Sequence, residues 1–339
     1  MSCFQLAYGL RLRSDLPIPG LTINRESQFD VAVWLASPAP SLLDVDQHSA
    51  LPCYTSDYQD QNGNPTLKAW RLPDSAGFKL RYSDGIEFTI DSQGNNVWGN
   101  WPPNMTLEDT AVYLLGPVLG FVLRLRGKIC LHASVICVDN CALALVGPAG
   151  SGKSTTAAAF ARLGYPILTD DVAAITSETD SFTIQPAYPH LRLWPRSVDM
   201  LYGNAKALPK LVPTSEWDKC YLDLSTKPNA FQLLPLPLNA IYILKQRSSA
   251  TSAPFIEPMS AAEGIIALVT NSYANYLLDK SLRASEFALL TGLASKVPPK
   301  QVTPHSDPVF LPDLCETILR DFSAGQANQA TKLAGNPLP

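Results

Sequence analysis

The sequence predicts an α/β fold preceded by a β-rich segment, on the basis of three observations. Residues 1–104 contain short runs of partly alternating apolar and polar residues that end at Gly, Pro, Asp or Asn, as strands and turns do. An apolar strand, a glycine-rich loop and a helix-forming run follow one another over 142–163. Residues 258–322 are mostly helical in pattern. We therefore expect a β-rich N-terminal domain at 1–104, an α/β domain at 105–322 and a disordered tail at 323–339.

The composition is that of an ordinary soluble globular protein. The 339 residues are 46% hydrophobic and 17% charged, enough for two domains with a sizeable core. The formal net charge is −4 without a basic stripe, so we expect neither nucleic acid nor a membrane as partner. The sequence has no apolar run of membrane-spanning length, no secretory signal and no CxxC pair among its seven cysteines. These features predict a cytoplasmic protein with reduced thiols.

Within the N-terminal domain, tight turns are expected at Ser83–Gly85 and Ser92–Asn95, which would make its strands antiparallel hairpins. The segment WGNWPPN at 98–104 breaks this pattern. A core helix is predicted next, over Thr106–Arg126, because its leucines and valines recur at helical spacing and Thr106 suits an N-cap. Pro117 lies inside this helix and is expected to kink or split it.

A glycine-rich loop carries the strongest chemical signal. Residues 147–154 (GPAGSGKS) match GxxxxGK[ST] at every required position, between an apolar strand at 142–146 and a helix from about Lys153. Its glycines allow backbone N–H groups to turn inward around phosphate oxygens, and the helix adds its positive N-terminal end. Lys153 would reach the β- and γ-phosphates, and Ser154 would ligate Mg²⁺. The expected nucleotide-binding residues are Gly147, Ala149, Gly150, Ser151, Gly152, Lys153, Ser154 and Thr155. A purely structural glycine loop is the alternative.

Two adjacent carboxylates, Asp170 and Asp171, end the short strand that follows the loop helix. We expect the C-terminal end of that strand to lie beside the loop, which would bring both acids to the phosphate site. One acid could hold Mg²⁺ while the other accepts the proton of an attacking hydroxyl. The sequence does not assign the two roles, and a solvated turn is the alternative.

His132 lies on a predicted strand at 129–138, which a turn at Asp139-Asn140 connects to the strand before the loop. On a period of two, His132 shares a face with Cys130 and Ser134. It is either a core or surface histidine, or a hydrogen-bonding partner of one aspartate that tunes its proton affinity.

The order of His132, a hairpin, the glycine-rich loop, a helix and Asp170-Asp171 resembles the catalytic domain of HPr kinase/phosphorylase, which is related in fold to phosphoenolpyruvate carboxykinase. The phrases LLGPVLGFVLRLRGKICLHAS, LALVGPAGSGKSTTAAAFARLGYPILTDDV and YPHLRLWPRS are similar to HPr-kinase-like proteins found with lasso-peptide and other peptide natural-product genes. The resemblance covers roughly 107–200 and weakens toward 320. In the N-terminal domain it is limited to YGLRLRSDLPIPGL.

The resemblance implies a P-loop mixed-sheet kinase domain that uses ATP and Mg²⁺ to phosphorylate a serine hydroxyl on a peptide or protein. One of Asp170 and Asp171 would be the general base with His132 as its partner. Ser154 would be a metal ligand together with the aspartates, and Lys153 would clamp the phosphates. HPr kinases form hexamers, and a homo-oligomer is left open for this chain. The sequence has no base-reading motif that distinguishes ATP from GTP.

The chain departs from the family downstream of the aspartate pair. The glycine-rich signature of HPr kinases is missing, and Pro189–Pro195 (PHLRLWP) occupies its place. This departure argues against recognition of HPr itself and against phosphorolysis. Arg192 and Arg196 are candidates for contacting phosphate or substrate, with a surface salt bridge as the alternative, and Lys219 is a further basic candidate.

Three functions are compatible with these residues. The first is a serine or threonine kinase for a peptide, such as a natural-product precursor, which the β-rich domain could hold by strand addition at a sheet edge. The second is a kinase for a small-molecule alcohol, which would use the same catalytic residues. The third is a nucleotide-dependent switch or scaffold with weak hydrolysis.

Overall fold

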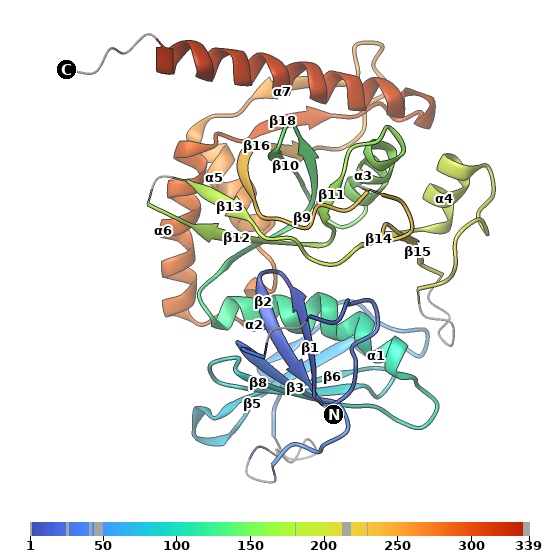
Figure 1. The fold of residues 1–339 in the computed structure, drawn as a ribbon, viewed down its shortest axis with the longest axis vertical. Coiled ribbons are helices and arrows are strands. Elements are labelled where there is room, and N and C mark those ends of the chain that lie inside the picture. The colour runs from blue at the N-terminus through green and yellow to red at the C-terminus, as the bar shows by residue number, and fades with distance from the viewer. Residues whose placement is uncertain are drawn as a thin grey trace.

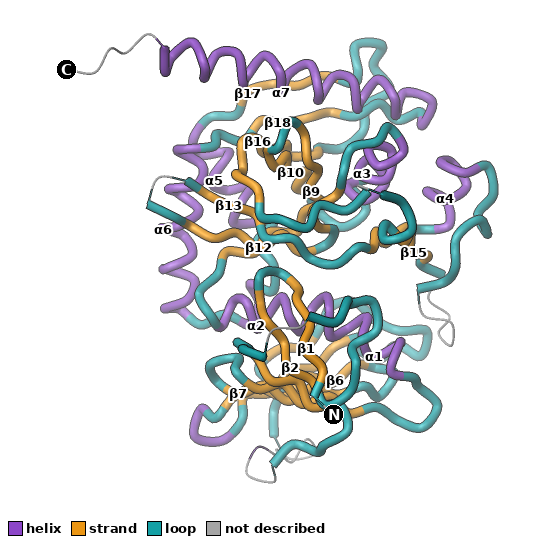
Figure 2. The backbone as a smooth tube through the Cα atoms, viewed as in Figure 1, coloured by secondary structure: helices purple, strands orange, loops and turns teal. Residues whose placement is uncertain are grey.

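The computed structural model contains two large β-sheets, with a helical segment between them and further helices around the second sheet (Figure 1). It describes the chain apart from residues 1, 25–26, 41–42, 44–49, 180, 212–217, 229 and 335–339. Strand and loop dominate the N-terminal part, whereas most helices surround the second sheet (Figure 2). None of the helices in the described ranges has both the length and the apolarity to cross a bilayer.

The first sheet is formed by the N-terminal part of the chain. Its strand order is β1 (Cys3–Ala7), β2 (Leu10–Ser14), β3 (Val31–Trp34), β8 (Asn96–Asn100), β7 (Glu87–Asp91), β6 (Gly77–Tyr82), β5 (Leu67–Arg71) and β4 (Tyr54–Thr55). A short 3₁₀ turn, η2 (Pro73–Ser75), joins β5 to β6. The predicted hairpins β6–β7 and β7–β8 are confirmed. The expected antiparallel pairing holds for β1 with β2 and along β4 to β8, but it fails at β3, which runs parallel to both β2 and β8.

The predicted helix after the break begins with α1 (Leu107–Tyr113), whose N-cap is Thr106 in a capping box with Asp109. Pro117 lies in a π-helical turn, η3 (Leu114–Val118), which separates α1 from α2 (Leu119–Leu125). The predicted splitting at Pro117 is therefore confirmed, since proline cannot donate the regular helical hydrogen bond. The apolar side of these helices completes the hydrophobic core of the first sheet.

The second sheet is mixed, and five of its strands, β10, β9, β12, β13 and β16, pair in a closed ring. Strand β10 pairs antiparallel with β9 on one side and parallel with β16 on the other, while β12 and β13 connect β9 back to β16. Strand β18 continues the sheet parallel to β16, and β17 and β11 add at the margins. The bounds are β9 (Ile129–Val138), β10 (Cys141–Val146), β11 (Ile167–Thr169), β12 (Val172–Ser177), β13 (Phe182–Ile184), β16 (Leu236–Leu244), β17 (Phe255–Pro258) and β18 (Lys300–Thr303).

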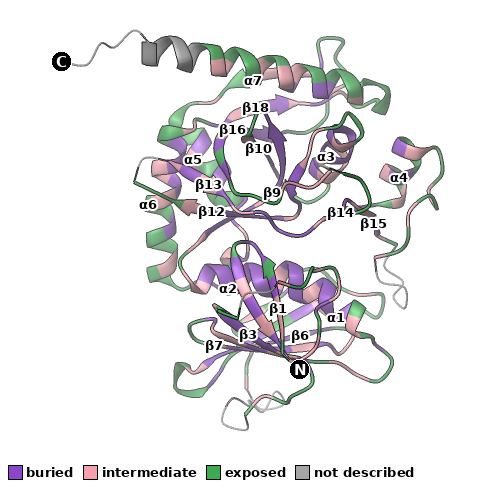
Figure 3. Ribbon diagram, in the orientation of Figure 1, coloured by how far each residue is buried: buried purple, intermediate pink, exposed green. Residues whose placement is uncertain are grey.

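Helices pack against both faces of this sheet, and the central strands β9 and β10 are buried (Figure 3). Helices α5 (Ala261–Thr270) and α6 (Lys280–Lys296), joined through a 3₁₀ turn, η4 (Asn275–Leu277), share one hydrophobic cluster with it. Helices α3 (Lys153–Arg162) and α7 (Leu311–Ala334) share another. A further 3₁₀ turn, η5 (Pro308–Phe310), leads into α7.

Two sequence-based expectations are corrected here. The predicted disordered tail from Ser323 is instead part of α7, which continues to Ala334 because the segment is rich in alanine and glutamine and Phe322 is anchored in the core. Residues 335–339 of that expectation lie outside the described residues. The pattern of residues 182–250 predicts short strands that alternate with proline-rich loops. This stretch also includes a helix, α4 (Pro195–Tyr202), beside the two-stranded ribbon of β14 (His190–Leu193) and β15 (Cys220–Asp223).

A buried ion pair ties the helical layer of the first sheet to the helices of the second. The Arg124 guanidinium on α2 lies 2.5 Å from the Glu286 carboxylate on α6, and the two side chains are only 4% and 7% exposed. Arg124 also donates to the Lys128 carbonyl, and the Ser272 hydroxyl donates to Glu286. Removing one partner would leave a charge buried without compensation.

We expect Glu286→Gln to lower the free energy of unfolding by about 3–5 kcal/mol, the usual cost of breaking a buried pair from one side. The double variant Arg124→Met/Glu286→Met should recover much of that loss because no charge is then stranded. Urea denaturation of the single and double variants measures both effects. Equal stability of Glu286→Gln and the wild type would show that the pair does not hold the layers together.

Candidate functional site

The glycines of the loop between β10 and α3 determine its backbone shape. Gly150 and Gly152 have φ of 81° and 104°, in the left-handed region where other residues are strained. A Cβ on Gly147 would lie 2.9 Å from the Ser151 hydroxyl oxygen, so the loop could not close as tightly with a larger residue there. Ser151 Oγ is buried and has no hydrogen-bond partner in the described part of the chain. The loop therefore depends on the glycines that the sequence motif requires.

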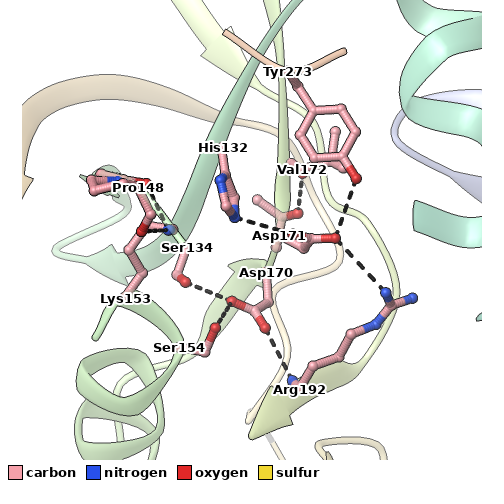
Figure 4. A network of polar contacts seen from close by, with 12 residues as sticks. His132, Ser134, Pro148, Lys153, Ser154, Asp170, Asp171, Val172, Arg192 and Tyr273 are labelled. Carbon is pink, nitrogen blue, oxygen red and sulfur yellow. Dashed lines mark hydrogen bonds and ion pairs between the residues drawn. The ribbon is translucent and has the colours of Figure 1, made fainter. Parts of the chain in front are cut away.

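Lys153, at the first turn of α3, is buried and folds back over the loop. Its Nζ donates to the Gly147 carbonyl at 2.7 Å and to the Pro148 carbonyl at 2.9 Å (Figure 4). Burial lowers the pKa of Lys153 to about 8, although the nearby carboxylates of Asp170 and Asp171 act in the opposite direction. The ammonium group is thus held in the loop, where a bound anion could replace the two carbonyls as its partner.

Asp170 connects three elements around the loop. Its carboxylate accepts hydrogen bonds from the Ser134 hydroxyl on β9 at 2.5 Å, the Ser154 hydroxyl on α3 at 2.9 Å and the Arg192 backbone N–H on β14 at 3.0 Å. The residue is 3% exposed. Three donors offset the cost of burying this carboxylate and fix Ser154, the hydroxyl of the motif, in one orientation.

The C-terminal end of β11 lies beside the loop, as expected, since Asp170 accepts a hydrogen bond from Ser154 of the loop. The two strands that lead to these residues are not neighbours. Strand β9 lies between them, with β10 on one side of β9 and β11 and β12 on the other. Ser134 on β9 bridges the gap, so the acids meet the loop across an intervening strand. Strand β9 takes the central place because it is long enough to pair with all three neighbours.

Asp171 lies next to Asp170 but faces a different set of partners. Its backbone is left-handed, with φ of 72°, and its side chain is 24% exposed. His132 Nε2 lies 3.3 Å from its carboxylate, the Tyr273 hydroxyl 3.4 Å and the Arg192 guanidinium 3.8 Å (Figure 4). Burial would raise the pKa of Asp171, but the hydrogen bond and charge of His132 and the charges of Arg192 and Lys219 hold it well below its usual range. Asp171 is therefore a carboxylate at neutral pH.

Arg192 is not a surface residue. Its side chain is 7% exposed, and its guanidinium donates to the Val112 carbonyl on α1 at 3.0 Å. Tyr8, from the turn between β1 and β2, packs edge-on against Tyr188, and Arg192 lies over the Tyr188 ring. The predicted surface alternative is thus wrong, because the first sheet and its helices cover this arginine. Direct contact of Arg192 with substrate stays a prediction, whereas its contact with Asp171 is a feature of the structure.

The remaining predicted residues fall on two sides of the loop. His132 lies beside Asp171, as the shared strand face with Ser134 allowed. Arg196 is exposed at the start of α4, where it lines a cavity next to the loop. Lys219 lies over the Trp194 ring at 5.2 Å, and burial lowers its pKa while Asp171 acts to raise it. Lys219 therefore approaches the same pair of acids.

Sequence reasoning missed two residues of this site as functional candidates. Ser134 donates to Asp170, and the only signal for it was the strand face that it shares with His132. Tyr273 reaches Asp171 from the segment after α5, and its ring packs edge-on near His132. No local pattern marks Tyr273, because its contact joins residues 102 positions apart along the chain.

The donor set fits a nucleotide with Mg²⁺. Within the described ranges, no group of three or more His, Cys, Asp or Glu side chains gathers to hold a metal by itself. Magnesium in nucleotide sites is commonly held by one or two carboxylates together with phosphate oxygens and water. Ser154, Asp170 and Asp171 supply donors of this kind beside the loop. The inward-facing lysine and the glycine backbone suit the phosphates.

Comparison with known proteins gives a distant structural likeness and no match in sequence. No protein-family profile matches the chain, and a search of curated proteins finds no similar sequence. Among solved structures, the chain is similar to the Hpr(Ser) kinase/phosphatase from Coxiella burnetii, with a TM-score of 0.35 and 11% identity. The likeness covers 61% of this chain and 99% of that chain.

The lowered pKa of Lys153 predicts a pH dependence of polyphosphate binding. Below pH 8 the ammonium form dominates, so tripolyphosphate affinity should change little there. Above pH 8 the anion must bind together with a proton, and the affinity should fall by up to about tenfold per pH unit. Calorimetric titration between pH 7 and 9.5 measures this trend. In Lys153→Arg, which stays protonated, the fall should vanish; a flat profile for the wild type would contradict the shift.

Proposed function

We propose that this protein is an ATP- and Mg²⁺-dependent kinase that transfers the γ-phosphate to a serine or threonine hydroxyl of a peptide or protein. The observation that carries the proposal is the bond from the Ser154 hydroxyl of the loop to Asp170, with the ionised Asp171 beside it. This arrangement combines a phosphate cradle, donors for a magnesium ion and a proton acceptor within one small region. The resemblance of residues 107–200 to HPr-kinase-like proteins of peptide natural-product clusters supports a precursor peptide as the acceptor.

The two aspartates would divide the work according to their surroundings. Asp170 is buried and saturated by three donors, one of which is the Ser154 hydroxyl, so it suits the metal side of the site. Asp171 has part of its carboxylate exposed and no donor from the loop, so it suits the acceptor side. His132 and Arg192 hold Asp171 in its charged form and in one orientation.

In the proposed step, Asp171 orients the acceptor hydroxyl and takes its proton as the oxygen bonds to the γ-phosphorus. The bond from that phosphorus to the β,γ-bridging oxygen breaks, and ADP leaves with the electron pair. Lys153 and the loop amides stabilise charge on the phosphate oxygens, while Mg²⁺ would add charge neutralisation at Ser154 and Asp170. The low pKa of Asp171 makes it a weak base, which suits a loose transition state in which the proton leaves late.

Incubation with ATP, Mg²⁺ and candidate peptides, followed by mass spectrometry, tests the proposal. The expected result is a mass gain of one phosphate on a serine or threonine of the peptide. A small-molecule alcohol kinase would phosphorylate small alcohols but no peptide, and a nucleotide switch would release ADP at the same rate with and without acceptor. Either of these results would replace the peptide-kinase proposal.

We expect Asp171→Asn to fold normally and to lower kcat by about two to four orders of magnitude, because the amide cannot accept the hydroxyl proton. His132→Ala should reduce kcat less, since it removes a partner of the base and leaves the base itself. Asp139→Asn, which changes an exposed aspartate in the β9–β10 turn, is the matched control and should keep the wild-type rate.

Asp170→Asn should behave differently from Asp171→Asn. It weakens the anchor of Ser154, so the Mg²⁺ concentration needed for half-maximal activity should rise in addition to any loss of kcat. Phosphate-release or coupled ADP assays across a magnesium titration separate the two variants. An unchanged magnesium requirement in Asp170→Asn would argue against the metal-side role of Asp170.

A further inference from the structure

A cavity lies beside the glycine-rich loop, on the side of α3 that leads away from the acids. It has a volume of about 100 Å³ and is lined by Ser151, Gly152 and Thr155 on one side. Arg196 on α4, Arg247 after β16, and residues 304–308 and 310 after β18 form the other sides. Neither Arg247 nor the lining residues after β18 take part in the chemistry proposed above.

The position of this cavity follows from the topology of the sheet. Strands β10, β16 and β18 run parallel to one another, so their C-terminal ends meet at one edge. The glycine-rich loop follows β10, Arg247 follows β16, and His305 follows β18. Ligands of open α/β sheets bind at this edge, where successive loops surround one crevice.

The walls of the cavity combine positive charge with aromatic surface. The guanidinium of Arg247 lies 3.1 Å from the point where a Cβ on Gly152 would be. Arg247 therefore borders the loop on the side where the phosphate next to the ribose of a bound nucleotide would lie. The rings of His305 and Phe310 lie in contact, with their centroids 4.1 Å apart and their planes tilted by 52°, and Phe310 is 38% exposed. An exposed ring beside two arginines is a stacking platform for a flat, electron-rich base.

Hydrogen bonds hold the loops of this cavity in place. Ser248 N–H donates to the Pro304 carbonyl at 2.9 Å, and Ser306 N–H donates to the Ser248 carbonyl at 2.8 Å. The N–H of Asp307 donates to His305 Nδ1 at 2.9 Å, which fixes the imidazole ring. The platform is thus preformed, and a ligand that stacks on it need not order these loops.

We propose that this cavity is the nucleoside subsite, in which the purine base stacks on Phe310 and His305 while Arg247 contacts the phosphate next to the ribose. The inference rests on the proposed kinase function, because it assumes that a nucleoside triphosphate occupies the glycine-rich loop. A drug-sized ligand needs roughly 300–1,000 Å³. The smaller cavity here matches one ring system, with the ribose and phosphates lying outside it along the loop.

The test compares the affinities of ATP and inorganic tripolyphosphate for the same protein by calorimetry. The ratio of the two dissociation constants isolates the contribution of the nucleoside, since both ligands use the loop. In Phe310→Ala we expect the preference for ATP over tripolyphosphate to fall by about 5- to 150-fold, the range for one base–aromatic stack. Phe310→Tyr should retain the preference. Phe287→Ala, at a 55% exposed phenylalanine on α6, is the matched control.

The outcomes separate the subsite from the kinase proposal. A wild type that binds ATP and tripolyphosphate equally, or a Phe310→Ala variant with an unchanged ratio, overturns the subsite while leaving the kinase proposal in place. A wild type that binds neither ligand overturns the kinase proposal, and the subsite with it. Retained tripolyphosphate binding in Phe310→Ala shows that the variant is folded and that only the nucleoside contact has changed.

Discussion

The carboxylate of Asp170 is the constraint on which the rest of the site depends. It is buried, and the hydrogen bonds donated by Ser134, Ser154 and the Arg192 backbone offset the cost of burying it. Those donors come from β9, α3 and β14, so one side chain sets the relative positions of three elements. Once Asp170 is fixed, the left-handed backbone of Asp171 turns the neighbouring carboxylate toward His132 and Tyr273. Adjacent residues thus serve different sides of one site.

The first sheet contributes to this site although it carries none of the acids. Tyr8, in the turn between β1 and β2, packs on Tyr188, and the Tyr8 hydroxyl donates to the Leu115 carbonyl. On α1, the Val112 carbonyl accepts a hydrogen bond from Arg192. Arg192 is therefore enclosed by groups from the N-terminal half of the chain before it meets Asp171. The buried pair of Arg124 and Glu286 fastens the same helical layer to α6. The N-terminal part consequently supports the geometry and charge of Asp171, whatever it contributes to holding an acceptor.

The second sheet places the proposed chemistry and the proposed nucleoside contact on two sides of one loop. Antiparallel β9 brings His132 and Ser134 to the side of the acids. Parallel β16 and β18 bring Arg247 and His305 to the opposite side. A mixed sheet allows this because β10 has one antiparallel and one parallel neighbour. The glycine-rich loop lies where the two halves meet.

The sequence by itself determined the local features, which are the glycine-rich loop, the helix after it, the Thr106 cap and the β9–β10 turn. It also determined the order along the chain of His132, the loop and the pair Asp170 and Asp171. These depend on backbone conformations and short-range hydrogen bonds that neighbouring residues specify. Only the tertiary structure decided that β9 separates β10 from β11, that Arg192 is buried, that Tyr273 reaches Asp171 and that α7 extends through the expected tail. Each of these depends on packing between residues far apart in the chain, which no local pattern encodes. The physical reason is that strand order and burial depend on which apolar surfaces of distant segments pack together, whereas turns, caps and loops depend on interactions within a few residues.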